Sequence, residues 1–192
     1  MSDLETLERR YRDAEGKFAF LQWRSEELRR QLDKLPLEML DAEGKERREG
    51  LQEEFNHCVM ELLTLPPQLE EMERRRVLAL LEWRNAQYSR LKSKAETIFR
   101  EDVTPLQARL HELEKHLEAD PGNEGIRSEL DQAQEAFSLA ENHYKQADAQ
   151  AAIFANSVTR EAGVSLSTPA DWDGHARKMG AEVRNAVLKV GL

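Results

Sequence analysis

Apolar residues recur at alternating spacings of three and four along two long segments of this 192-residue chain. In segment 2–35 they are Leu4, Leu7, Tyr11, Ala14, Phe18, Leu21, Leu28, Leu32 and Leu35, with only Ser25 polar in the series. In segment 124–162 they are Ile126, Leu130, Ala133, Phe137, Ala140, Tyr144, Ala147, Ala151, Phe154 and Val158. This spacing keeps one narrow stripe turned toward a neighbouring helix, as in left-handed coiled coils. The sequence therefore predicts an all-α fold: an elongated antiparallel helical bundle or coiled coil of long helices, with a short C-terminal amphipathic helix.

Helix breakers divide the chain into six predicted helices. The breaks are placed at Pro36, Pro66–Pro67, Pro105, the turn Asp120–Asn123 and the loop Gly163–Pro169. The helices then span about 2–35, 37–64, 68–103, 105–119, 124–162 and 169–190. Asn123 is a predicted N-cap, and Gly163 is a predicted C-terminal glycine in the left-handed conformation.

Turn positions also predict which residues meet. A turn near 121–122 pairs residue i with about 243 − i, which brings Tyr144 near Phe99. A turn at Pro36 pairs i with about 72 − i, and a second turn at 66–67 places Trp23 level with Trp83. Three regions follow: a three-helix bundle over 1–103, an antiparallel coiled-coil arm over 104–163 that continues the bundle, and a loop with the C-terminal helix over 164–192.

Charge and composition narrow the classes of function. The net charge is −9, and the acidic excess lies in residues 101–192, which argues against nucleic acid and anionic lipid as partners. A single cysteine, Cys58, cannot form an internal disulfide, and its place on an apolar helix face predicts a buried thiol. The chain begins with acidic residues and lacks an apolar run of about 18, so a cytoplasmic location is expected.

Chemical motifs are scarce. Glu54 and His57 have the Glu-x-x-His spacing, with Glu61 one turn further, but a di-iron bundle needs a second such motif and none occurs. We therefore expect these residues to lie on a solvent-exposed face of a helix. Glycine-rich phosphate loops and paired Cys-x-x-Cys are also absent from the sequence. We therefore predict no catalytic, cofactor-binding or metal-ligating residue and no enzyme activity.

The remaining candidates are partner-binding residues. Those of the terminal helix are Trp172, Met179, Val183 and Val190, and this helix either folds back on the bundle or docks on another chain. Trp23 lies about half a turn off the Leu21–Leu28 seam, so it either packs on a third helix, the interpretation we favour, or binds a partner.

The function expected from these features is non-enzymatic coiled-coil protein–protein interaction or assembly, as a scaffold or adaptor that self-associates as a homodimer. Two alternatives remain open. One is a helical bundle bound peripherally to a membrane surface. The other is a helical enzyme whose site forms between subunits.

Overall fold

A computed structural model describes residues 3–190, and of Val190 it describes the backbone only. The predicted all-α fold is confirmed, since 93% of the chain is helical. The elements are α1 (Asp3–Asp41), α2 (Lys45–Ile98), the π-helix η1 (Phe99–Val103), α3 (Thr104–Ala119), α4 (Glu124–Ala162), the 3₁₀-helix η2 (Pro169–Asp171) and α5 (Trp172–Val190).

The chain forms two compact units. One comprises Met1–Trp83 with Ser167–Leu192, and the other comprises Arg84–Leu166. α1, α5 and the first part of α2 belong to the former, which we call the terminal unit, and α3 and α4 belong to the latter, the central unit. The division therefore falls inside α2, where the sequence has no proline or glycine to mark it.

The prediction that Pro36 and Pro66–Pro67 end helices is wrong. Pro36 lies inside α1, and both Pro66 and Pro67 lie inside α2. A proline inside a helix removes one hydrogen bond and costs about 3 kcal/mol. Buried side chains follow each proline, with Ala42 3% exposed beyond Pro36 and Leu69 0% exposed beyond Pro66–Pro67, and their burial offsets part of that cost.

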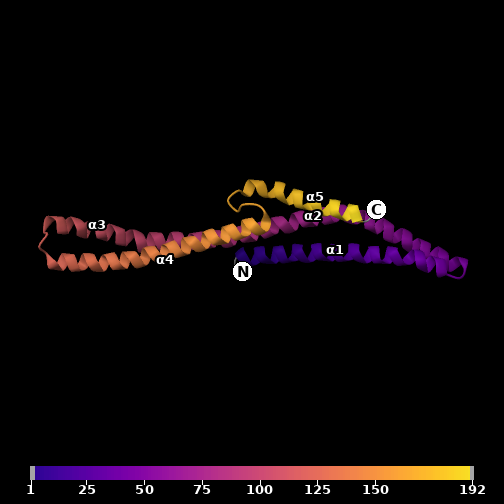
Figure 1. Cartoon of the computed structure of the whole chain (residues 1–192), viewed down its shortest axis with the longest axis horizontal. Helices are drawn as coiled ribbons and strands as arrows, with labels where there is room; N and C mark the ends of the chain where they lie inside the picture. Colours follow the sequence, from indigo (N-terminus) through magenta and orange to yellow (C-terminus); the bar gives the residue numbers. More distant parts are fainter. Residues whose placement is uncertain (1–2, 191–192) are drawn as a thin grey trace. The chain divides into compact units, whose positions relative to one another are not determined.

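The connection between α1 and α2 lies further along the chain, at residues 42–44. Gly44 has φ +89°, a left-handed conformation that suits glycine. The two helices run antiparallel from this loop (Figure 1). The later turn changes the register, so that Arg24 pairs with Glu61 and Tyr11 stacks on Trp83. The pairing of i with about 72 − i is therefore wrong.

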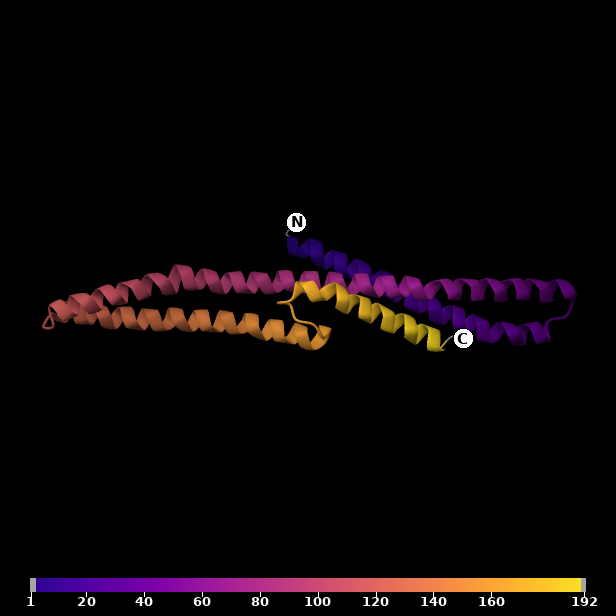
Figure 2. The ribbon, with the colours of Figure 1, turned by 90° about the horizontal axis from the view of Figure 1, so that it is seen from above.

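α5 supplies the third helix of the terminal unit, in place of the separate third helix that was predicted from 68. Figure 2 shows α5 running beside α2. Val183 and Val187 of α5 pack on a core of α1 and α2 side chains. The core residues are Phe18, Leu28, Leu35, Cys58, Leu65 and Leu69. The apolar seam of the terminal helix is thus covered by its own chain, which answers the question whether this helix folds back.

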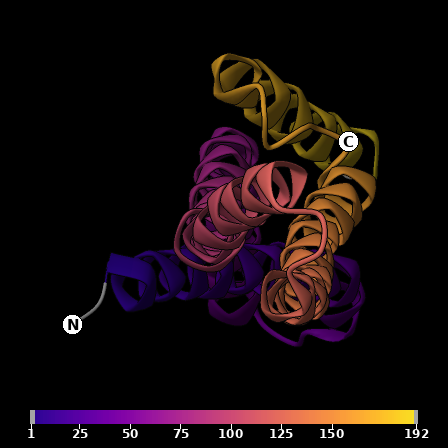
Figure 3. The same cartoon turned by 90° about the vertical axis from the view of Figure 1, so that its left-hand side faces the viewer.

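In the central unit α4 lies beside α3 (Figure 3) and η1, and it runs antiparallel to them after the turn at 120–123. The predicted register is confirmed, because the rings of Phe99 and Tyr144 lie 5.1 Å apart between centroids. Asn123 caps α4 by accepting a hydrogen bond from the amide of Ile126 at 3.1 Å, and Gly163 ends it with φ +70°. Both terminus signals were therefore correct.

The predicted helix break at Thr104–Pro105 is a π-helical turn. α2, η1 and α3 form one continuous helical run of 75 residues. Pro105 has no amide hydrogen to donate to the preceding turn, and π-helical turns are one way to accommodate such a gap. The Thr104 hydroxyl donates to the Phe99 carbonyl at 3.0 Å, so this side chain bonds back to the preceding turn inside the continuous helical run.

Candidate interaction surface

The residues of α5 that were predicted to bind a partner lie largely against their own chain. Trp172 is 8% exposed, and Met179 and Val183 are half-buried. The side chain of Val190 lies outside the described part of the structure. The amphipathic pattern of α5 therefore forms the interface with α1 and α2.

Polar contacts fix the position of α5 on α2. The Arg74 guanidinium donates to Asp173 at 2.8 Å and lowers the pKa of that carboxyl. Arg184 forms an ion pair with Glu70 at 3.2 Å. Between these pairs Gly180 is buried, and a Cβ built on it would lie 2.5 Å from the carbonyl oxygen of Glu70. The two backbones meet here at a distance that glycine alone permits.

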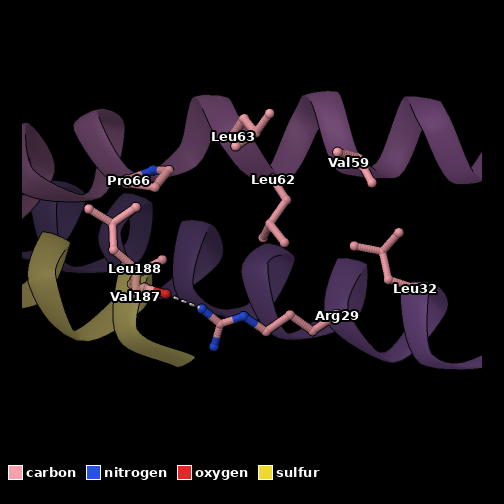
Figure 4. A pocket seen from close by; sticks show the side chains of 8 residues that line it. All are labelled: Arg29, Leu32, Val59, Leu62, Leu63, Pro66, Val187 and Leu188. Carbon is pink, nitrogen blue, oxygen red and sulfur yellow. Dashed lines mark hydrogen bonds between the residues drawn. The ribbon is translucent and has the colours of Figure 1, made fainter. Parts of the chain in front are cut away.

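A small apolar pocket of about 90 Å³ lies where α1, α2 and α5 meet (Figure 4). Leu32, Leu62 and Val187 are among its lining residues. At its edge an Arg29 nitrogen donates to the Val187 carbonyl at 2.8 Å. Ligand pockets usually measure about 300–1,000 Å³, so this space is a packing gap between three helices.

The most exposed aromatic side chains among residues 3–190 lie on α1. Phe20 is 58% exposed and Trp23 is 50% exposed, with ring centroids 5.8 Å apart. Trp23 is two residues from both Leu21 and Ser25, so at about 100° per residue it points away from the buried seam. The prediction that Trp23 packs on a third helix level with Trp83 is therefore wrong.

Gly16 and Ala19 extend this exposed surface toward the N-terminus of α1. Together with Phe20 and Trp23 they have the spacing i, i+3, i+4, i+7, which places all four on one face of the helix. We call these four residues the outer stripe. Sequence reasoning identified only Trp23. The spacing of Gly16, Ala19 and Phe20 in the sequence could have identified them too, but the longer series of apolar residues on the opposite face of the helix dominates the pattern.

The groups considered for chemistry are dispersed. His57 Nε2 lies 3.9 Å from Glu61 on an exposed part of α2, and Glu61 itself is held by Arg24. Burial raises the pKa of the Cys58 thiol, which donates to Gln31 Oε1 at 3.5 Å. Within residues 3–190 there is no group of three His, Cys, Asp or Glu side chains that could hold a metal ion.

None of the described helices is long and apolar enough to cross a membrane. Comparison with known proteins gave no matching family model, no matching curated protein and no matching solved structure. The geometry of the outer stripe is therefore the basis for a functional proposal.

Proposed function

We propose that this chain is a non-enzymatic protein–protein interaction module, a scaffold or adaptor, and that the outer stripe of α1 is its binding surface. One observation supports the proposal: Phe20 and Trp23 are each at least half exposed on the face of α1 that points away from the core. Half-exposed aromatic rings that adjoin one another are the kind of side chain that dominates binding energy at protein interfaces.

The fold does not require these two aromatic residues. The opposite face of α1 already supplies the core residues Phe18, Leu28 and Leu35. Other exposed apolar side chains of the terminal unit, such as Leu40 and Met60, are aliphatic and are of a kind that is common on protein surfaces. The outer stripe differs because it combines two adjoining rings with two small residues on one helix face.

The charges beside the stripe favour a protein over a membrane as its partner. Asp13, Glu15, Glu26 and Glu27 lie close to it on α1 and alternate with Arg12, Lys17, Arg24 and Arg30, so the surroundings of the stripe carry no excess of positive charge. Helices that lie on membrane surfaces usually carry lysine and arginine on the polar face, because anionic lipid attracts them. Here the carboxylates offset the basic side chains, so the attraction to anionic lipid is weak.

Photo-crosslinking tests the proposal. A photoreactive phenylalanine at position 20 is expected to crosslink the full chain to a protein, either another chain or a second copy. The double variant Phe20→Ser, Trp23→Ser is expected to abolish binding of that protein. The control is Leu139→Ser, Ile153→Ser, which changes two similarly exposed residues of the central unit and is expected to retain it. Crosslinking to lipid vesicles alone, or binding that survives the double variant, would contradict the proposal.

A further inference from the structure

We infer that the partner on the outer stripe is a second copy of this chain, packed antiparallel so that Trp23 of each α1 covers Gly16 of the other. The inference rests on the proposed function and identifies the partner. A two-fold axis passing between residues 19 and 20 would place residue i of one helix opposite about 39 − i of the other. Such an interface is isologous and closes at two chains.

The sizes of the side chains in the stripe are self-complementary in this arrangement. Trp23 and Gly16 are seven residues, or about 10 Å, apart on the same face. The two-fold axis exchanges their positions, so that the largest side chain of the stripe meets the residue without one. A Cβ built on Gly16 would meet nothing within 4 Å, so there is room above it. Phe20 lies next to the axis and meets Phe20 of the second copy.

A shallow hollow beside the stripe can receive the indole ring. It has a volume of about 530 Å³ and runs from Gly16 and Phe20 toward Met72 on α2. Arg12, Asp13 and Lys17 also line the hollow, and the Arg12 guanidinium donates there to Glu8 at 2.6 Å. The hollow therefore offers Trp23 an apolar floor with charged side chains at its edge.

Charged residues at the two ends of the stripe favour the antiparallel direction. Glu8 and Glu26 are 18 residues apart, which is five full turns, and so are Arg12 and Arg30. All four therefore lie on one flank of α1, where Arg12 pairs with Glu8 at 2.6 Å and Arg30 pairs with Glu27 at 3.1 Å within the chain. The two-fold axis brings Arg12 opposite Glu26 and Glu8 opposite Arg30, so each contact joins opposite charges. A parallel pair would instead turn this flank toward the opposite flank of the second helix, so these four residues would not meet one another.

The size of the stripe predicts a weak dimer. Four residues on one helix bury less surface than the roughly 1,200 Å² of a standard stable interface, so we expect weak association. The monomer and the dimer are therefore expected to exchange within the concentration range of ordinary hydrodynamic experiments.

Sedimentation equilibrium of the full chain from 1 to 200 µM tests this partner. The wild-type chain is expected to form a dimer, Phe20→Ser, Trp23→Ser to stay monomeric, and Leu139→Ser, Ile153→Ser to dimerise like the wild type. A dimer that persists in the stripe variant overturns the inference. So does a wild-type monomer at every concentration. If the wild-type chain is a monomer but residue 20 still crosslinks to another protein through the stripe, the proposed function stands and only the inference about the partner fails. If there is no such crosslink either, both the proposed function and the inference are contradicted.

Charge reversal tests the direction of packing. Arg12→Glu places two glutamates opposite each other and is expected to weaken the dimer at least tenfold. Arg12→Glu, Glu26→Arg restores opposite charges in the antiparallel pair and is expected to recover most of the affinity. A parallel pair would gain nothing from the second change, so a failure to recover overturns the antiparallel arrangement. Circular dichroism of each variant verifies that the helices are intact.

Discussion

Gly180 of α5 lies against the backbone of Glu70 in α2, so close that a Cβ on the glycine would be 2.5 Å from the Glu70 carbonyl oxygen. This contact joins a C-terminal helix to a segment more than 100 residues earlier in the chain. The Arg184–Glu70 ion pair lies beside it. The close approach makes the docking of α5 dependent on one residue.

Gly180→Ala is therefore expected to destabilise the docked α5. The methyl group would collide with a carbonyl that belongs to a helix and cannot move easily, a cost of about 1–3 kcal/mol. Faster proteolysis in the loop 163–168 would report the loss. Gly174→Ala in the same helix is the matched control, because its Cβ would meet nothing within 4 Å. The control should raise the stability by up to about 1 kcal/mol. Equal protection in both variants would contradict the contact.

Pro36→Ala is expected to stabilise the chain, because the helix already continues through this exposed position. Alanine restores the missing amide and removes the steric conflict with the previous turn. The gain should be about 1–2 kcal/mol, less than the full helical penalty of proline because the unfolded chain also becomes freer. Urea denaturation measures it. A loss of stability would instead favour a turn at Pro36.

Stability is expected to depend on the protonation of Glu61. Arg24 donates two hydrogen bonds to this carboxylate, at 2.7 and 2.6 Å, and lowers its pKa. A carboxyl with a lowered folded-state pKa stabilises the fold above its unfolded-state pKa, and this contribution is lost as the pH falls through the folded-state value. Glu61→Gln should flatten that part of the stability curve, measured by urea titrations between pH 2 and 7. Glu53→Gln, at an exposed site on the same helix, should leave the curve largely unchanged.

Phe99 and Tyr144 are expected to be coupled across the central unit. Their centroids lie 5.1 Å apart at an interplanar angle of 54°, a tilted aromatic pair. A double-mutant cycle with Phe99→Ala and Tyr144→Ala should give a coupling free energy of about 0.5–1.5 kcal/mol. Phe99→Ala with Phe137→Ala supplies a comparison for the additive case. A coupling near zero for the first pair would place the register of α4 elsewhere.

The apolar spacing of the sequence was enough to predict the all-α fold and the pairing of the central unit. Both depend on local information, because the turn at 120–123 carries its own signals and fixes the register of the helices on either side. For the same reason α4 begins after Asn123 and ends at Gly163, as predicted.

The terminal unit depended on tertiary structure. Proline predicts a break from local geometry alone, but burial of Ala42 beyond Pro36 and of Leu69 beyond Pro66–Pro67 favours continuing the helix through these prolines. The turn therefore lies at Gly44 and not at Pro36, and every residue pairing between α1 and α2 differs from the predicted one as a result. The third helix of this unit is α5. Its apolar spacing shows only that one of its faces is apolar and does not identify the surface against which that face packs. The sequence determined which faces are apolar; only packing between distant segments decided which of them are covered, and it left Phe20 and Trp23 exposed.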